Sequence, residues 1–467
     1  MPIDLRLESD ETPLLIDLYE LTMAASYFQI GFNEPACFSL SVRRLPPQRG
    51  FLVAAGLERV VEALEHFQFS QPALDSLEAL KLFSPEFLQF LSNLRFTGQV
   101  DAVAEGTIFF ADEPIIEIYG PLIEAQLVES LVMNQVGVAT LIASKAVRSV
   151  IAAGGRRLVD FGLRRSQGAD ASLVAARSSY LAGFIGTSNV LAGCRYHIPL
   201  YGTLAHSYIM AHERERDAFD HFVQLFPRLS TLLVDTYDTV RGVENAALVA
   251  RDLRDKGFKL QAVRLDSGDL ADLSIKARRI LDQNGLQDVS IFASGNLDEY
   301  RIRELIRAGA PIDAFGVGTS MVVSADAPSL DLTYKLTEYR GVPRMKTSLN
   351  KVSLPGRKQW FRGFNANGSF YADVIALADE GATTVAREFK PPPAEALPMM
   401  QPQLNGGYRV GPRPALTESR ARLIESLAKL EQRYKDLDKP ATYPVKRTTA
   451  LSAMLTNERM RAEKRQD

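Results

Sequence analysis

The chain has 467 residues, enough for two or three domains, and its 46% apolar and 24% charged residues are the balance of an ordinary globular protein. Its 54 Lys and Arg against 56 Asp and Glu give a net charge of −2, which argues against a general affinity for nucleic acid or anionic membranes. The two cysteines form no disulfide framework or metal motif, and neither a signal peptide nor an apolar run of about 18 residues is apparent, so we expect a cytoplasmic protein.

The first 122 residues mix helical and strand patterns and are predicted to form an N-terminal α+β domain. Residues 12–31 are apolar at helical spacing, with Thr12 as a candidate N-cap and Pro13 as the first helical residue. Residues 97–118 alternate in short apolar runs broken by Gly, Asp and Pro, which predicts antiparallel strands.

A different rhythm marks residues 123–333. Seven short apolar runs end in polar or glycine-bearing loops, and most are followed by a helical pattern, which predicts a parallel α/β sheet with right-handed crossovers. So many units favour a TIM-like (β/α) barrel over an open doubly wound sheet, and in a barrel the loops converge at the C-terminal ends of the strands. The seven segments are 156–165, 184–189, 198–207, 232–238, 262–269, 289–296 and 312–320.

The remaining chain differs again. Residues 334–388 read as short strands rich in Lys and Arg, expected to return to the N-terminal domain. Residues 389–467 read as a C-terminal extension, Pro-rich and irregular to about residue 413. Residues 415–437 predict an amphipathic helix, and the charged last 15 or so residues are expected to be disordered.

Two glycine-bearing loops carry candidate chemistry. In the segment GVGTS, Gly316, Gly318 and Thr319 could bring backbone N–H groups close to a phosphate, although a plain tight turn would look the same. In RLDSGD, strand alternation puts Arg264 and Asp266 on the same side, where they suit an anionic substrate, ribose hydroxyls or Mg²⁺. The alternative there is an internal ion pair, and Asp269 is expected to be a helix N-cap in either case.

Two further loops add an aromatic side chain and a histidine. In DFGLRR, Phe161 could stack on a planar heterocycle and Arg164 could bind phosphate. The alternative is a core Phe beside solvated arginines. GTLAHS contains His206, whose neutral imidazole can attack a phosphoryl group. The alternative is a structural histidine whose hydrogen bonds are satisfied within the protein. The four other histidines have no comparable setting and are interpreted as structural or surface residues.

Together these segments resemble the nicotinate phosphoribosyltransferase family. The resemblance runs in the family's order from about Pro13 to Arg362 and is echoed at residues 439–446; it rests on LIDLYELTMAASYF, DFGLRR, GTSNVLAG, YGTLAHS, VDTYDT, RLDSGDL, ASGNLDEY, FGVGTS and GRKQWFR. It implies a type II phosphoribosyltransferase barrel, a second, discontinuous α+β domain and a homodimer with shared active sites. The implied reaction joins nicotinate to phosphoribosyl pyrophosphate (PRPP) with Mg²⁺, coupled to ATP hydrolysis through a phosphohistidine.

The resemblance also implies roles for individual residues. Phe161 would stack on one face of the pyridine and Tyr19 of the other subunit would cover the second face, while Arg264 would meet the nicotinate carboxylate or the reacting centre. His206 would be phosphorylated, Asp266 would hold ribose hydroxyls, and Asp266 or Asp269 could hold Mg²⁺. Arg164 would contact phosphates, the GVGTS loop the 5′-phosphate, and Lys and Arg at 344–358 the pyrophosphate. The other implied substrate-binding residues are Gly186, Thr187, Ser188, Ser207, Asp235, Ser294 and Gly295.

Ser188 bears on the choice of pyridine. A related enzyme that uses nicotinamide has an Asp in this loop, and a carboxylate there would repel nicotinate, so Ser188 favours the acid. The alternatives are nicotinamide or quinolinate phosphoribosyl transfer on the same fold, a non-catalytic phosphosugar-binding homologue, and a barrel isomerase or hydrolase.

Overall fold

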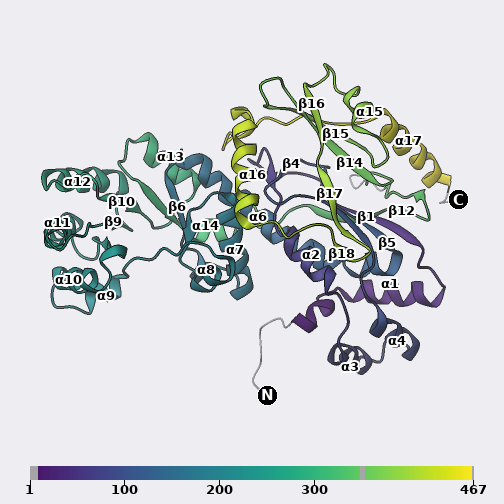
Figure 1. Ribbon diagram of the computed structural model, residues 1–467, viewed down its shortest axis with the longest axis horizontal. Helices are drawn as coiled ribbons and strands as arrows, with labels where there is room; N and C mark the ends of the chain where they lie inside the picture. The colour runs from purple at the N-terminus through teal and green to yellow at the C-terminus, as the bar shows by residue number, and fades with distance from the viewer. Residues whose placement is uncertain (1–8, 348–352, 465–467) are drawn as a thin grey trace. The chain divides into compact units, whose positions relative to one another are not determined.

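The computed structural model describes residues 9–347 and 353–464, and the chain divides into two units (Figure 1). One unit is Ile142–Pro328; the other joins Met1–Leu141 to Ser329–Asp467. The domain boundaries expected at residues 122, 333 and 388 stay a prediction.

A six-stranded parallel sheet is the framework of the unit Ile142–Pro328. Its strand order is β7-β6-β11-β10-β9-β8. The strands are short and largely buried, which is typical of a parallel sheet covered by helices. They are β6 (Arg157–Asp160), β7 (Gly186–Thr187), β8 (Thr231–Leu233), β9 (Ala262–Leu265), β10 (Ser290–Ala293) and β11 (Ala314–Val317).

The helices of this unit begin directly after the polar loops. Asp238, Asp269 and Asp298 accept hydrogen bonds from the first backbone N–H groups of α11, α12 and α13, and α11 and α12 pack beside β9 (Figure 1). The expected N-cap role of Asp269 is therefore confirmed. The helices are α7 (Ala169–Ala182), α8 (Val190–Tyr196), α9 (His206–Met210), α10 (Glu215–Leu225), α11 (Thr239–Asp255), α12 (Leu270–Gln283), α13 (Glu299–Arg307) and α14 (Thr319–Val322).

The predicted barrel is present as a curled, half-barrel parallel sheet. The sheet begins at β7 and ends at β8, and no pairing joins these two strands within residues 9–347 and 353–464. The segment 198–207, predicted as a strand, contributes one isolated bridge, between Leu200 and Thr187. Pro199 cannot donate a ladder hydrogen bond, and Gly202 weakens a strand, so the ladder does not continue here.

An antiparallel sheet of seven strands organises the other unit. Its order is β13-β12-β1-β5-β3-β17-β18, and β3 and β5 confirm the antiparallel strands expected at residues 97–118. β12 pairs with β1, so chain after residue 332 joins strands from the first 121 residues. The strands are β1 (Pro35–Val42), β3 (Gln99–Val103), β5 (Pro114–Pro121), β12 (Leu332–Tyr339), β13 (Val342–Pro343), β17 (Met400–Asn405) and β18 (Tyr408–Arg409).

Two smaller sheets and several helices complete this unit. A four-stranded sheet has the order β16-β14-β15-β19, and β2 pairs with β4. The strands of these two smaller sheets are β2 (Leu52–Val53), β4 (Ile108–Phe109), β14 (Lys358–Phe364), β15 (Phe370–Leu377), β16 (Glu395–Pro398) and β19 (Val445–Arg447). The helices of the unit are α1 (Leu18–Gln29), α2 (Leu57–Glu65), α3 (Gln71–Ala79), α4 (Pro85–Asn93), α5 (Leu122–Leu127), α15 (Ala382–Ala386), α16 (Leu416–Lys429) and α17 (Thr449–Lys464).

Several local predictions for this unit were wrong. Pro13 lies in a separate 3-10 turn, where Leu15 N–H bonds to the Thr12 carbonyl, and α1 begins after Asp17 rather than Thr12. The Pro-rich region contains strands β16 to β18, because edge strands and bulges tolerate Pro. The charged end forms α17 because Leu451 and Leu455 are buried.

The helix α6 (Glu129–Ala153) is long and apolar enough to cross a membrane by composition alone. However, 72% of its most apolar stretch is buried inside the protein. Its composition is therefore explained by packing in the interior.

Candidate active site

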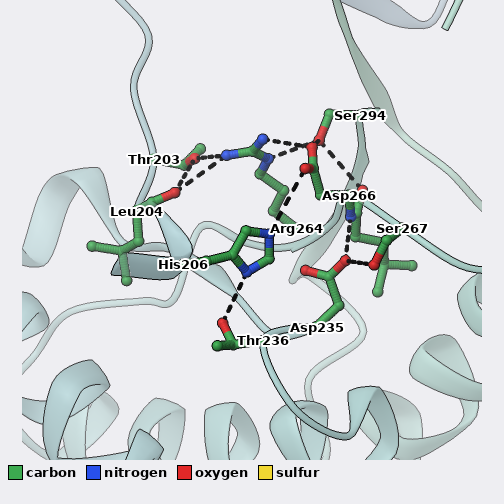
Figure 2. A network of polar contacts seen from close by, with 10 residues as sticks. Thr203, Leu204, His206, Asp235, Thr236, Arg264, Asp266, Ser267 and Ser294 are labelled. Atoms are coloured by element: carbon green, nitrogen blue, oxygen red, sulfur yellow. Dashed lines mark hydrogen bonds and ion pairs between the residues drawn. The ribbon is translucent and has the colours of Figure 1, made fainter. Parts of the chain in front are cut away.

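Arg264 on β9 lies at the centre of a network of polar contacts (Figure 2). Its Nε donates to Ser294 Oγ at 2.7 Å and its Nη2 to Asp266 Oδ1 at 2.6 Å. Its Nη1 donates to Thr203 Oγ1 at 2.6 Å and to the Leu204 carbonyl at 3.2 Å. Only 15% of the side chain is exposed, so the cation is held rigidly near the ends of three loops.

Asp266 shares this network and is kept ionised by it. Ser294 Oγ donates to its Oδ1 at 2.5 Å, and Arg264 donates to the same oxygen. Although burial raises the pKa of Asp266, the Ser294 hydrogen bond and the Arg264 charge together lower that pKa below its ordinary value. Gly295 has φ of +88°, and a Cβ there would lie 2.0 Å from the Asp266 carbonyl, so this close approach requires glycine.

Asp235 follows β8 and supports the Asp266 loop. Its Oδ2 accepts from Asp266 N–H at 2.9 Å and from Ser267 Oγ at 2.6 Å. The carboxylate is 8% exposed, and its Oδ1 is buried without a hydrogen-bond partner in the described part of the chain. An orphaned carboxylate oxygen is costly unless a ligand or cation satisfies it. Asp269, in contrast, uses Oδ1 to cap α12.

His206 begins α9 and faces the same loops. Its Nδ1 lies 3.1 Å from Thr236 Oγ1, and its Nε2 lies 3.8 Å from Asp266 Oδ2. The side chain is 41% exposed, so the imidazole is both oriented and accessible. The structure thus brings together His206, Arg264 and Asp266, the three residues predicted to be catalytic.

Phe161, at the end of β6, supplies the aromatic face. Its ring stacks on Phe292, with centroids 5.5 Å apart, and the Arg264 guanidinium carbon lies 5.5 Å from the ring centroid. Phe161 and Thr203 also line a cavity of about 350 Å³, whose wall mixes apolar and polar side chains. A planar ring could therefore stack near a fixed cation. Apolar residues of the wall include Val159, Ile185, Leu200, Leu260, Ala262 and Ala314.

The GTSN loop serves the packing of the sheet. Thr187 is fully buried and donates its hydroxyl to Asp160 Oδ2 at 2.7 Å, while Ser188 N–H donates to the Asp160 carbonyl. Gly186 is close to its neighbours, because a Cβ there would lie 2.3 Å from the Pro199 carbonyl. The side chain of Ser188 in this loop is partly exposed.

Three residues predicted to bind substrate are exposed. Arg164, Ser207 and Thr319 have no side-chain hydrogen bond to other residues within 9–347 and 353–464, so their donors are available to a ligand. Gly318 precedes α14. Gly316 has a packing role: a Cβ there would lie 2.5 Å from the Phe161 ring.

The matching family models and two relatives with more than 30% sequence identity indicate the same family. The model of the nicotinate phosphoribosyltransferase N-terminal domain matches residues 14–137, the family model matches 156–351, and the C-terminal domain model matches 357–455. A nicotinate phosphoribosyltransferase of Mycobacterium tuberculosis is 51% identical over 362 residues, 78% of each chain. The chain belongs to the nicotinate phosphoribosyltransferase family.

Two further relatives cover nearly the whole chain. The Bacillus subtilis nicotinate phosphoribosyltransferase is 37% identical over 458 residues, 94% of this chain and 93% of that protein. The crystal structure of human nicotinic acid phosphoribosyltransferase matches with a TM-score of 0.84 and 31% identity, over 94% of this chain and 99% of that one. The chain is therefore an enzyme of this family.

Residues of the other unit that the family resemblance singled out have varied settings. Tyr19 on α1 is 48% exposed, and burial together with Glu129 raises the pKa of its hydroxyl. Within residues 344–358, positions 348–352 lie outside the described residues. Lys358 is buried and paired with Glu117 at 2.8 Å, so its charge is used inside the protein. Arg357 lies over the Tyr119 ring at 4.2 Å.

The buried carboxyl group of Glu20, next to Tyr19, is expected to make the stability of the folded protein depend on pH. Burial raises the pKa of Glu20 from 4.5 to about 7, against hydrogen bonds from Ser130 that lower it. The folded state therefore binds a proton on Glu20 more tightly than the unfolded state does. The stability that this proton contributes is complete below about pH 4.5 and is lost as the pH rises through 7. We expect Glu20→Gln to melt roughly 2 °C above the wild type at pH 8, with no such gain at pH 4.5. Thermal unfolding at both values measures this, and equal gains would contradict it.

A side chain at position 316 is expected to change the position of the Phe161 ring. A Cβ would also approach Phe292, at 3.0 Å, so Gly316→Ala must displace the Phe161 ring. We expect the KM for the family's pyridine substrate to rise about tenfold, the loss of about 1.4 kcal/mol of binding. Gly202→Ala is the control, because nothing lies within 4 Å of a Cβ there. An unchanged KM in the Gly316 variant would show that the ring position does not matter.

Thr203 and Thr236 belong to this network, although they were not among the site residues predicted from the sequence. Each bonds to a predicted catalytic side chain, Thr203 to Arg264 and Thr236 to His206. Both lie inside segments that carry the family resemblance, three residues before His206 and one after Asp235. Their position in these segments was the available signal; their contacts depend on loop geometry.

Proposed function

We propose that this enzyme joins nicotinate to PRPP, giving nicotinate mononucleotide and pyrophosphate, with ATP hydrolysis coupled through phosphorylated His206. The observation that carries the proposal is the placement of one cation, Arg264, against an aromatic face, an ionised carboxylate and an accessible imidazole. The finer architecture proposed with it is a type II barrel in which the segment 198–207 lies beside β7, where Leu200 and Thr187 form a bridge.

Phe161 and Arg264 together suit nicotinate. A pyridine ring stacked on Phe161 gains about 0.5–1.5 kcal/mol beyond burial of its area. Arg264 has five N–H donors, and four of them are used by Ser294, Thr203, Leu204 and Asp266. The remaining Nη2 donor can bond to the carboxylate of nicotinate. Ser188 brings no negative charge to the neighbouring loop, which favours the acid over nicotinamide.

Asp266 is suited to the ribose of PRPP. Its pKa is below the ordinary value, so it accepts hydrogen bonds from hydroxyl groups at neutral pH. As pyrophosphate leaves, positive charge develops on the ribose, and a fixed carboxylate stabilises that charge. Arg164 and the backbone around Gly318 and Thr319 are the proposed contacts of the phosphates. Holding both substrates in a fixed orientation supplies much of the rate enhancement.

The residues present fit Mg²⁺. The unpartnered Oδ1 of Asp235 and the nearby Asp266 carboxylate are hard oxygen ligands. No cluster of three or more potential metal ligands was found in the described residues, which agrees with the habit of Mg²⁺ to bind one or two carboxylates with substrate phosphates. When bound, the ion would neutralise charge on the pyrophosphate. Asp269 is the weaker candidate because it caps α12.

The ATP requirement is tested through His206. We expect ATP to raise nicotinate mononucleotide formation by the wild type and to leave His206→Ala unaffected, with the basal reaction retained. His66→Ala is the matched control, because His66 is exposed and bonds to its own helix. An unchanged ATP response in His206→Ala would leave the transferase and return His206 to a structural role.

A homodimer in the cytoplasm is part of the same proposal. Tyr19 has an exposed ring, as a residue offered to another subunit requires. Tyr19→Ala is expected to weaken nicotinate binding while sedimentation gives the dimer mass. A monomeric, fully active wild type would contradict shared active sites.

A further inference from the structure

Thr203 makes contacts that its place in an irregular loop does not require. Its Oγ1 accepts from Arg264 Nη1 at 2.6 Å and donates to the Leu204 carbonyl at 3.2 Å. The Leu204 carbonyl accepts from the same guanidinium nitrogen at 3.2 Å. Both hydrogens of Nη1 are therefore used by two consecutive residues, which fixes the plane of the guanidinium.

The same short segment carries His206. Thr203 and Leu204 hold one side of Arg264, and His206, two residues after Leu204, lies 3.8 Å from Asp266 on its other side (Figure 2). Asp266 is itself bonded to Arg264 at 2.6 Å. Arg264 and His206 are thus joined twice, through the chain of residues 203–206 and through Asp266.

We propose that Thr203 is a positioning residue that fixes the Arg264 guanidinium for the carboxylate of the pyridine substrate and ties it to the segment of His206. This inference rests on the proposed function, since it concerns nicotinate as the substrate. Because Thr203 and His206 lie in one short segment, loss of the Thr203 hydroxyl is expected to weaken any effect that phosphorylation of His206 has on the affinity for nicotinate.

Thr203→Val tests the link, because valine keeps the shape of threonine and removes the hydroxyl. We expect the Kd for nicotinate, measured calorimetrically, and its KM to rise about tenfold, with kcat and the KM for PRPP within twofold of the wild type. ATP is expected to phosphorylate His206 normally but to leave the nicotinate KM of this variant unchanged. Thr203→Ser keeps the hydroxyl and is expected to restore both properties.

Thr456→Val is the matched control, because Thr456 is exposed on α17 and its hydroxyl donates to the Ser452 carbonyl of the same helix. It is expected to behave as the wild type. A Thr203→Val enzyme with wild-type nicotinate affinity and ATP response would overturn the inference, and so would equal losses for nicotinate and PRPP that serine does not restore. If the wild type forms no nicotinate mononucleotide, the proposed function fails and the inference with it; that result is distinct from a wild type that works and a valine variant that matches it.

Discussion

Arg264→Ala is expected to lower kcat/KM for nicotinate by on the order of 10³, about 4 kcal/mol of transition-state stabilisation. Two losses add up to this effect. The substrate carboxylate loses its cation, and Asp266 and Ser294 lose the partner to which both are bonded. Removing one member of a buried charge pair also commonly costs 3–5 kcal/mol of folding stability. Steady-state kinetics with nicotinate and PRPP measure the change.

Arg264→Lys separates charge from geometry. Lysine keeps the charge, but its single ammonium group cannot bond to Thr203, Leu204, Ser294 and Asp266 at once, so we expect a loss of about 10². Arg216→Ala is the control, because Arg216 pairs with Asp220 and Asp252 at the surface of the same unit. Either Arg264 variant with kcat/KM within threefold of the wild type would contradict the role given to this residue.

The second large effect concerns stability. Asp373→Asn is expected to destabilise the unit that contains β14 and β15 by about 3–5 kcal/mol. Arg362 and Asp373 are 1% and 0% exposed and joined by hydrogen bonds of 2.7–3.2 Å, and Tyr443 also donates to Asp373. Asparagine removes the negative charge of Asp373 and leaves the buried Arg362 cation with Glu113 as its neighbouring acidic group, whose pKa burial raises.

The sole tryptophan makes this prediction measurable. Trp360 is fully buried on β14, and the Arg362 guanidinium lies 5.1 Å from its ring, so tryptophan fluorescence reports unfolding of this unit. We expect the urea midpoint to fall in Asp373→Asn with little change in slope. Asp379→Asn, at an exposed position, is the control. A midpoint equal to that of the wild type would show that the buried pair adds no net stability.

The sequence allowed the convergence of the site to be predicted. Side chains alternate along a strand, so Arg264 and Asp266 were expected on one side, and they are bonded to each other. The repeated pattern of a strand and a polar loop placed His206 and Phe161 beside them, because loops after parallel strands share one edge. The N-cap role of Asp269 followed from its position before an apolar helical pattern.

Other features depended on packing that no local pattern encodes. Gly316 resembles a phosphate loop, but its Cα position is crowded by the Phe161 ring from another strand. Thr203 and Thr236 acquire their roles from neighbours 61 and 30 residues away. The segment 198–207 has the apolar pattern of a strand, yet it makes one bridge, so the sheet is open where a closed barrel was expected.

The most direct measurement supplies PRPP and Mg²⁺ with nicotinate, nicotinamide or quinolinate in separate reactions and quantifies each mononucleotide and pyrophosphate. The site described here predicts nicotinate mononucleotide as the main product, with pyrophosphate formed in equal amount and a kcat/KM at least tenfold above those of the other pyridines. Turnover of nicotinamide or quinolinate in preference to nicotinate, or no product from nicotinate at all, would contradict the assignment of Arg264 and Phe161 to this substrate.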